Sequence, residues 1–145
     1  MPPLILSGEA IFMSGVSKPY PPPGLEWWTK KEPVLVKVSE VKAIVPPKHV
    51  ESSSFPLIRT ENMEVFITEM RPGAKAEVDV HPVSEHAFLV LSGRAKFVIE
   101  GKEYDLEPGM FIWMPPGVKH ENWTVGDETL RMVVIFAPSR LKEKK

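Results

Sequence analysis

The sequence contains no cysteine and no glutamine, and its only asparagines are Asn62 and Asn122. The lack of cysteine excludes disulfides, thiolate metal sites and cysteine nucleophiles, so any metal must be bound through nitrogen and oxygen atoms. The shortage of thermolabile side chains, beside abundant lysine and glutamate, favours a thermophilic source.

Long apolar runs and a large net charge are also missing. No apolar run approaches the roughly 18 to 20 residues that span a bilayer, and the first residues lack the basic and apolar regions of a signal peptide. We therefore expect a cytoplasmic protein without a membrane partner. A formal net charge of −1 gives no electrostatic footprint for nucleic acid. A length of 145 residues suits one domain.

Proline is concentrated in the first third of the chain. Residues 1–47 hold nine of the sixteen prolines, and the run 19–24 must be extended or turn-like because proline fixes φ and lacks a donor. The adjacent Trp27 and Trp28 favour packing of this N-terminal arm on the rest of the protein or on a second subunit. A partly disordered leader is the alternative.

From about residue 57, short apolar and polar runs alternate with a period of two and are separated by turn residues. This pattern is typical of half-buried strands, and its turn spacing predicts an all-β antiparallel sandwich or barrel. A short helix is possible only near residues 139–145, a charged tail that otherwise stays in solvent. The expected strands are 64–70, 76–81, 87–91, 95–99, 103–106, 110–114, 119–124 and 130–136, with a turn at 71–73 after the first.

Three of the four histidines occur in a pattern that suggests a metal site. Asp79 and His81 are two residues apart on an expected strand, so their side chains share one face. His86 opens the next apolar strand, and His120 follows a turn rich in proline and glycine. Imidazole nitrogens and a carboxylate suit Mn, Fe, Zn, Ni or Cu, so we predict one divalent transition metal per chain. His49 is interpreted as a solvated loop residue.

The spacing around these residues resembles the two motifs of the cupin family. The first motif is Gly, five residues, His-x-His, three or four residues, Glu, six residues and Gly. The second is Gly, five residues, Pro-x-Gly, two residues, His, three residues and Asn. This sequence places Gly73, Asp79, His81, His86 and Gly93 at the first set of positions, and Gly109, Pro115, Gly117, His120 and Thr124 at the second.

The resemblance covers roughly residues 60 to 137 and implies a cupin double-stranded β-helix, or jelly-roll, barrel. We divide the chain into a Pro-rich N-terminal arm (1–47), a cupin barrel (48–138) and a charged C-terminal tail (139–145). Carried over residue by residue, the metal ligands become Asp79, His81, His86 and His120. Glu85 is a rival of His86 for the third place, and the six-residue spacing to Gly93 favours His86.

The site pattern is most similar to the ureidoglycine aminohydrolase branch of cupins, in which Glu-x-His-x-x-x-His and a later Gln hold manganese. Here Asp79 replaces the Glu, one extra residue precedes His86, and His120 replaces the Gln. Those enzymes contain two barrels, whereas this chain has one. The resemblance therefore supports the metal site more than it supports that substrate.

We expect a metal-dependent enzyme acting on a small polar metabolite, with hydrolase, aminohydrolase-like or dioxygenase-like chemistry. Glu85, Glu77 and Tyr104 are candidates for a catalytic acid or base by proximity in sequence alone. The alternative is a non-catalytic cupin that binds or senses a small ligand, and a cupin without its metal is a third reading. A homodimer is expected because single-barrel cupins commonly pair and because the arm carries two tryptophans.

Overall fold

The computed structural model describes residues 33–45 and 49–143. Within these ranges the chain forms strands joined by tight turns, with a short 3-10 helix near each end. The elements are η2 (Val38–Glu40), β1 (His49–Arg59), β2 (Glu64–Asp79), β3 (Glu85–Ser92), β4 (Arg94–Ile99), β5 (Lys102–Leu106), β6 (Phe111–Met114), β7 (His120–Val125), β8 (Leu130–Ala137) and η3 (Arg140–Glu143). None of the helices in these ranges has the length and apolar character needed to cross a membrane.

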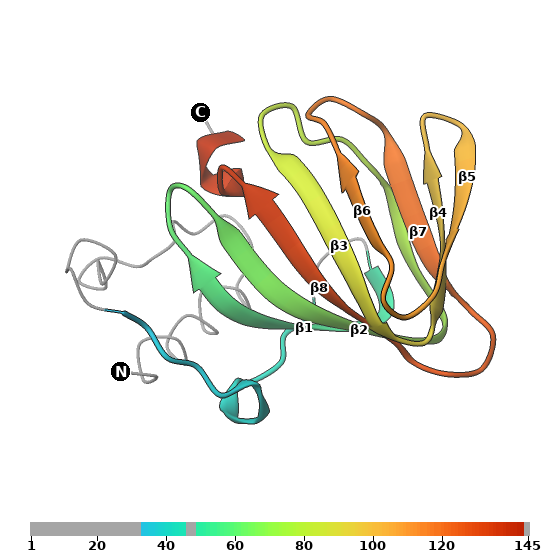
Figure 1. The fold of residues 1–145 in the computed structure, drawn as a ribbon, viewed down its shortest axis with the longest axis horizontal. Helices are drawn as coiled ribbons and strands as arrows, with labels where there is room; N and C mark the ends of the chain where they lie inside the picture. Colours follow the sequence, from blue (N-terminus) through green and yellow to red (C-terminus); the bar gives the residue numbers. More distant parts are fainter. Residues whose placement is uncertain (1–32, 46–48, 144–145) are drawn as a thin grey trace.

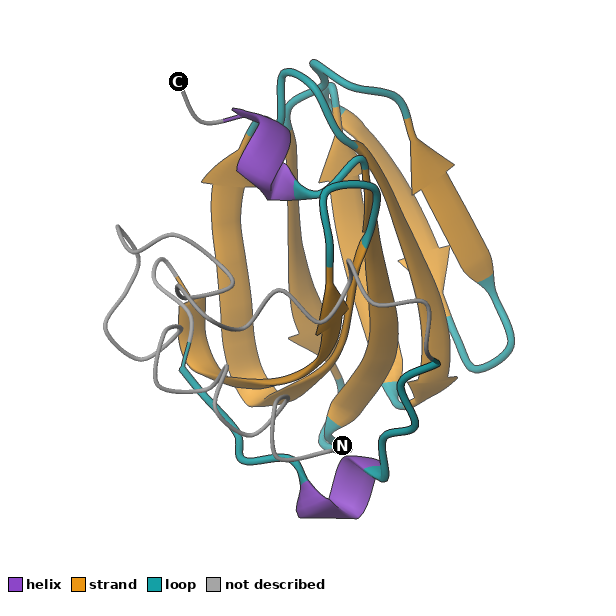
Figure 2. Cartoon of the chain, turned by 90° about the vertical axis from the view of Figure 1, so that its left-hand side faces the viewer, coloured by secondary structure: helices purple, strands orange, loops and turns teal. Residues whose placement is uncertain are grey.

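The strands form one antiparallel sheet in the order β5-β4-β7-β2-β8-β3-β6, and β1 pairs with β2 outside this path. The sheet curves around a common interior and nearly closes into a barrel (Figures 1 and 2). This is the all-β antiparallel barrel that the sequence predicts, and β2 to β8 fall within a few residues of the expected strands. β1 has no counterpart among the expected strands. The expected short helix at the C-terminal end is η3, which follows β8 in Figure 1.

β2 combines two of the expected strands, 64–70 and 76–81, into one. The predicted break at residues 71–73 is wrong, because β2 continues through it as a single 16-residue strand. Gly73 has a φ of 87°, a conformation that favours glycine, and it bends the strand. β1 pairs with both halves of β2, whereas β8 pairs with the first half and β7 with the second. The bend therefore lets one strand run along two sides of the barrel.

The barrel interior is filled by the inward-facing side chains of every strand from β2 to β8. On β8 these are Leu130, Met132, Val134 and Phe136, each at most 2% exposed, with outward residues between them. This alternation in burial is the one that a β-strand imposes on successive side chains. The other members of the core include Met70, Ala74, Ala76, Phe88, Val90, Ala95, Phe97, Leu106 and Met114.

The described part of the arm lies against β1. Val41 is buried, and Val34 and Val36 pack with it against a second apolar cluster that includes Phe55 and Leu141. An isolated bridge joins Ile44 to Ser54 of β1. Residues 1–32, which contain Trp27 and Trp28, lie outside the described residues.

Candidate metal centre

Three histidines from separate elements meet inside one end of the barrel. His86 is on β3, His120 begins β7, and His81 lies in the loop after β2. They are 6 to 9% exposed, and one ligand nitrogen from each lies within 4.8 Å of the others. The loop is held in place because the Gly117 N–H donates to the His81 carbonyl oxygen at 2.8 Å. The two sequence motifs are thus joined at the site.

Strand alternation separates His86 from its neighbour Glu85. His86 is 6% exposed and faces the interior, whereas Glu85 is exposed and accepts a hydrogen bond from Trp113 Nε1 at 2.9 Å. In the sheet, His86 lies opposite Phe136 on one side and Met114 on the other. The structure therefore points the His86 side chain toward the other two histidines and the Glu85 side chain away from them.

Aromatic packing fixes the imidazole of His86. Its ring stacks on Phe136 with 3.8 Å between centroids and 19° between planes, and Phe88 lies at 4.4 Å on the same strand. The ring centroids of His81 and His120 lie 5.1 Å and 5.2 Å from that of His86. The packing leaves His86 little freedom to turn its nitrogens elsewhere.

The hydrogen bonds of the three rings differ. His120 Nδ1 lies 3.3 Å from the Val118 carbonyl oxygen, a contact that makes Nδ1 the donor and leaves Nε2 with a free lone pair. His81 Nδ1 lies 3.4 Å from Glu143 Oε1. Both ring nitrogens of His86 are buried without a hydrogen-bond partner among the described residues. A buried polar group without a partner is costly unless a ligand satisfies it.

Asp79 lies beside the cluster without being enclosed by it. Its Oδ2 is 3.8 Å from His81 Nε2, and its Oδ1 accepts the Val80 N–H at 2.9 Å. Asp79 is also the register partner of His120 across β2 and β7. Its side chain is 43% exposed. A carboxylate at this position can move toward the histidines without a change in the sheet.

Burial lowers the pKa of two of the three imidazoles, those of His86 and His81. Burial, helped by His120, His81 and Arg140, holds the pKa of His86 well below its ordinary value. Burial also lowers the pKa of His81, and it outweighs the opposite effects of Asp79 and Glu143. Neutral imidazole is the form that binds metal.

A buried ion pair between Glu64 and Arg140 lies next to Phe136, the residue on which the His86 ring stacks. Glu64 is the register partner of Phe136, is 1% exposed, and accepts hydrogen bonds from Arg140 with both oxygens. Arg59 Nε is 3.5 Å from the same carboxylate. Burial would raise the pKa of Glu64, but Arg140 and Arg59 outweigh it and hold this pKa below its ordinary value. The Arg140 guanidinium also lies over the Phe136 ring at 4.3 Å.

The fourth histidine is not the solvated loop residue that we expected. His49 begins β1, is partly buried, and has an Nδ1 without a hydrogen-bond partner among the described residues. Burial lowers the pKa of His49, the charge of Arg140 lowers it further, and Asp79 opposes both. These influences place His49 in the same polar neighbourhood, although it is not one of the three clustered histidines.

The weak catalytic candidates lie apart from the histidines. Glu85 faces Trp113, and Glu77 is exposed on β2. Tyr104 lies opposite Phe97, packs against the hydrophobic core, and has the Lys102 ammonium 5.4 Å from its ring. No contact described for these three residues reaches the cluster. Sequence reasoning missed Glu64, Arg140 and Glu143. Glu64 and Arg140 are 76 residues apart and Glu143 is 62 residues from His81, so no local signal links them.

The residues present fit a transition metal. Three imidazoles and a nearby carboxylate are an N₃O donor set, which suits Zn, Mn, Fe, Ni or Cu. Metal–nitrogen bonds of about 2.0–2.1 Å would draw nitrogens already within 4.8 Å onto one ion by small side-chain movements. Such an ion would also supply a partner for a buried His86 nitrogen that has none among the described residues.

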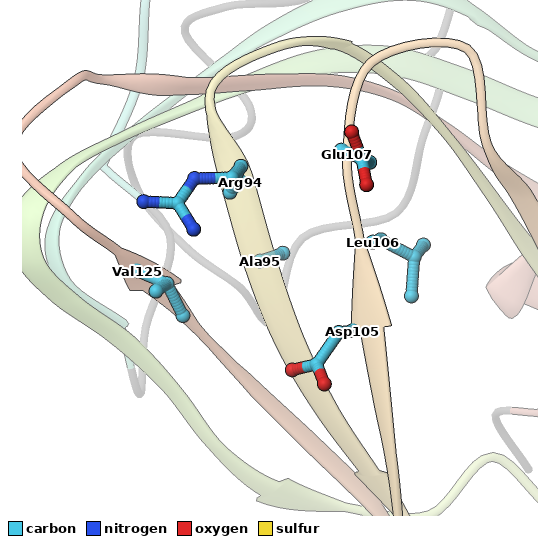
Figure 3. A pocket seen from close by; sticks show the side chains of 6 residues that line it. All are labelled: Arg94, Ala95, Asp105, Leu106, Glu107 and Val125. Carbon is cyan, nitrogen blue, oxygen red and sulfur yellow. The ribbon is translucent and has the colours of Figure 1, made fainter.

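A separate hollow lies at the other end of the barrel. It is lined by Arg94 and Ala95 at the start of β4, by Asp105, Leu106 and Glu107 around the end of β5, and by Val125 at the end of β7 (Figure 3). Since His120 begins β7, the length of that strand separates the hollow from the histidines.

Comparisons with known proteins agree with this architecture. The family model described as the Cupin domain matches residues 66–136. No curated protein gives a significant match.

Among solved structures, an RmlC-like cupin from Shewanella frigidimarina is 15% identical with a TM-score of 0.67, over 78% of this chain and 97% of that chain. The polyketide cyclase RemF from Streptomyces resistomycificus is 24% identical with a TM-score of 0.66, over 74% and 81%. A predicted oxalate decarboxylase from Thermotoga maritima is 14% identical with a TM-score of 0.65, over 72% and 99%. At these identities the likeness concerns the fold. Residues 66–136 thus match a cupin domain, the fold is that of cupin structures, and three clustered histidines that could bind a metal lie inside the barrel.

Proposed function

We propose that this protein is a metal-dependent cupin enzyme that acts on a small polar metabolite. The metal would be held by His81, His86, His120 and Asp79. One observation carries the proposal: His86 is buried and stacked in place, yet neither of its ring nitrogens has a partner among the described residues. A metal ion would satisfy the His86 nitrogen that binds it and use all three imidazoles together.

Each protein group has a distinct part in this arrangement. The Val118 carbonyl orients His120, while Phe136 and Phe88 hold the His86 ring. Asp79, the most exposed of the four, would supply the oxygen ligand and the open side of the site. A bound divalent metal in such a site acts as a Lewis acid or lowers the pKa of bound water.

The reaction class follows from the metal. Manganese or zinc would favour hydrolase or aminohydrolase-like chemistry, as in the ureidoglycine aminohydrolase branch that the motif resembles. Iron, copper or nickel would favour dioxygenase-like chemistry. The structural neighbours named as a polyketide cyclase and a predicted oxalate decarboxylase support an enzyme of some kind. No general base is proposed, because Glu85, Glu77 and Tyr104 have no described contact with the cluster.

Elemental analysis of purified protein tests the proposal. We expect about one transition metal per chain in the wild type and in Glu77→Ala, an exposed control on β2. The double variant His81→Ala with His120→Ala should bind none. A wild type that stays metal-free after reconstitution with each candidate ion overturns the proposal. A loaded protein that turns over no small metabolite would favour the non-catalytic binding or sensing module.

We also propose that the protein is a homodimer. β6 is an end strand of the sheet, and its outward Phe111 and Trp113 are 60% and 51% exposed. Leu91 on the adjoining β3 is 41% exposed, so apolar surface is continuous over both strands. A second copy covering this face would remove that surface from water. Sedimentation should give a dimer for the wild type and a monomer for Phe111→Glu with Trp113→Glu. The cytoplasmic location and the thermophilic source stay predictions.

A further inference from the structure

The C-terminal segment, residues 139–143, is fastened to the barrel at several points. Ser139 is fully buried, and its N–H donates to the Glu61 carbonyl oxygen at 3.1 Å. Leu141 packs into the apolar cluster around Val41. Arg140 makes the bidentate ion pair with buried Glu64. The charged tail therefore does not extend into solvent before Glu143, and η3 has a defined place beside the end of β8 (Figure 1).

Glu143 reaches from η3 to the loop that carries His81. Its Oε2 accepts the Val83 N–H at 3.2 Å and the Ser84 N–H at 2.9 Å. Its Oε1 lies 3.4 Å from His81 Nδ1. The Glu143 side chain is only 13% exposed and that of His81 only 10%. Two backbone donors thus fix the carboxylate, and the fixed carboxylate faces one nitrogen of the imidazole.

The opposite nitrogen of His81 faces the candidate site. Nε2 is the atom that lies 3.8 Å from Asp79 Oδ2. A carboxylate oxygen can only accept a hydrogen bond, so Glu143 favours the tautomer with the proton on Nδ1. That tautomer leaves the Nε2 lone pair available toward Asp79, His86 and His120. Hydrogen-bonding of a metal-ligating histidine to a carboxylate through its other nitrogen is a recurring way to set its tautomer and raise its basicity.

We propose that Glu143 is a positioning residue that holds His81 in the Nδ1–H tautomer, with Nε2 directed at the metal. The inference rests on the proposed metal site. It also couples the site to the C-terminal segment, because η3 must be docked for Glu143 to reach His81. By thermodynamic reciprocity, bound metal stabilises the docking of η3 as much as docked η3 strengthens metal binding.

Glu143 differs from the group that orients His120. The Val118 carbonyl is a neutral acceptor two residues away on the same chain segment, so it does not depend on another element. Glu143 is charged and 62 residues from His81. The orientation of His81, unlike that of His120, should therefore depend on the docking of the C-terminal segment.

Glu143→Gln is the decisive variant. Glutamine has nearly the same shape and can still accept the Val83 or Ser84 N–H with its carbonyl oxygen, but its NH₂ group then faces His81 Nδ1. This favours the Nε2–H tautomer, which has no lone pair on the nitrogen that faces the metal site. Competition with a chromophoric chelator, using zinc and manganese separately, should show affinity 10- to 100-fold weaker than in the wild type. Glu61→Gln is the matched control, because Glu61 pairs with Lys142 of the same helix and not with a histidine.

A spectroscopic readout tests the tautomer without metal. Imidazole ¹⁵N chemical shifts of the chelator-treated protein at pH 8 should assign the proton of His81 to Nδ1 in the wild type and in Glu61→Gln. In Glu143→Gln the fraction with the proton on Nε2 should rise. If Glu143→Gln does not fold, Glu143→Asp, which keeps the charge on a shorter side chain, should show a smaller change in the same direction.

The outcomes separate this inference from the proposed function. An unchanged tautomer together with unchanged metal affinity in Glu143→Gln overturns the role of Glu143, whatever the wild type binds. A wild type that binds neither ion overturns the proposed metal function, while the tautomer measurement still decides whether Glu143 orients His81. Equal weakening in Glu143→Gln and Glu61→Gln would mean that only the docking of η3 matters, and this also overturns the positioning role.

Discussion

The two ends of the barrel interior are built on different principles. Where β8 begins, the interior residues Leu130, Met132 and Met70 are apolar and at most 1% exposed. Where β8 ends, the row across β2, β8 and β3 is Glu64, Phe136 and His86. The same strands thus pass from a core made of hydrocarbon to one made of charges, imidazoles and an aromatic ring.

The two ends also differ in how much they contribute to the stability of the fold. Each fully buried aliphatic side chain at the apolar end contributes about 1.5–3 kcal/mol by leaving water. A buried polar group without a partner costs about 1–3 kcal/mol instead, and His86 has two such nitrogens among the described residues. An arrangement that lowers stability in this way is expected at a functional site, where a ligand supplies the missing interaction.

Breaking the ion pair at the polar end should have the largest effect on stability. Glu64→Gln leaves Arg140 without its bidentate carboxylate partner and removes the charge that faces Arg59. We expect the free energy of unfolding to fall by about 3–5 kcal/mol, as for a buried pair that loses one partner. Urea denaturation followed by circular dichroism measures this change.

Glu69→Gln is the matched control for this prediction. Glu69 lies on the same strand and pairs with Arg131 at 2.9 Å, but both side chains are 37% exposed. Its loss should cost less than about 1 kcal/mol. Equal effects of the two variants would mean that the two ends do not differ in how they use charge.

At the apolar end, steric crowding should be what destabilises the fold. Gly93 has a φ of 76°, and a Cβ there would lie 2.5 Å from the Thr129 carbonyl oxygen and 2.7 Å from the Leu130 Cα. Gly93→Ala should lower the free energy of unfolding by about 2–4 kcal/mol. Gly101 has a φ of 82° but open space around its Cβ position, so Gly101→Ala should cost only about 1–2 kcal/mol. A thermal or urea unfolding comparison in which Gly93→Ala is the milder variant would contradict this account.

Much of the fold could be predicted from sequence because its signals are local. The turn spacing predicted the strands from β2 to β8, and the glycines at 73, 93, 109 and 117 all have positive φ, as turns and bends require. The six-residue spacing to Gly93 favoured His86 over Glu85, and in the structure the His86 side chain faces the other two histidines.

The other half of the site could not be predicted, because its partners are far apart in sequence. Nothing near Glu64 indicates that Arg140 will pair with it 76 residues later, or that Glu143 will face His81. His49 was misjudged because the signal for β1 is weak around its serines, so a strand start was interpreted as a loop. The supposed turn at 71–73 was a bend inside β2, since Arg-Pro-Gly fits both conformations.

Acid should weaken the polar end of the metal-free protein. The pKa of His86 and that of His81 are lowered in the folded state, while unfolded histidines keep an ordinary pKa near 6.5. Below that pH the unfolded chain binds more protons than the folded one, so stability falls as the pH falls. The loss is at most about 1.4 kcal/mol per pH unit for each such histidine.

Urea titrations with chelator at pH 7.5, 6.5 and 5.5 measure this dependence. Glu64 contributes little in that window, because its ordinary pKa is 4.5 and the folded state lowers it further. A free energy of unfolding that stays constant, or rises, between pH 6.5 and 5.5 would contradict the lowered histidine pKa values.

The smallest expected effect has the opposite sign and separates the two ends most directly. His86→Leu replaces a ring with two unpartnered nitrogens by a hydrocarbon of similar size beside Phe136, Phe88 and Met114. The metal-free protein should become more stable by about 1–2 kcal/mol, because a buried polar group is removed from apolar surroundings. Phe88→Leu, two residues further along the same face of β3, should instead lose about 1 kcal/mol. In His86→Leu the loss of stability between pH 6.5 and 5.5 should also become shallower, and metal binding should disappear. If His86→Leu destabilises the metal-free protein as Phe88→Leu does, then His86 serves packing alone. In that case the polar end stabilises the fold by packing as the apolar end does, and the conclusion that it lowers stability in order to bind a metal is wrong.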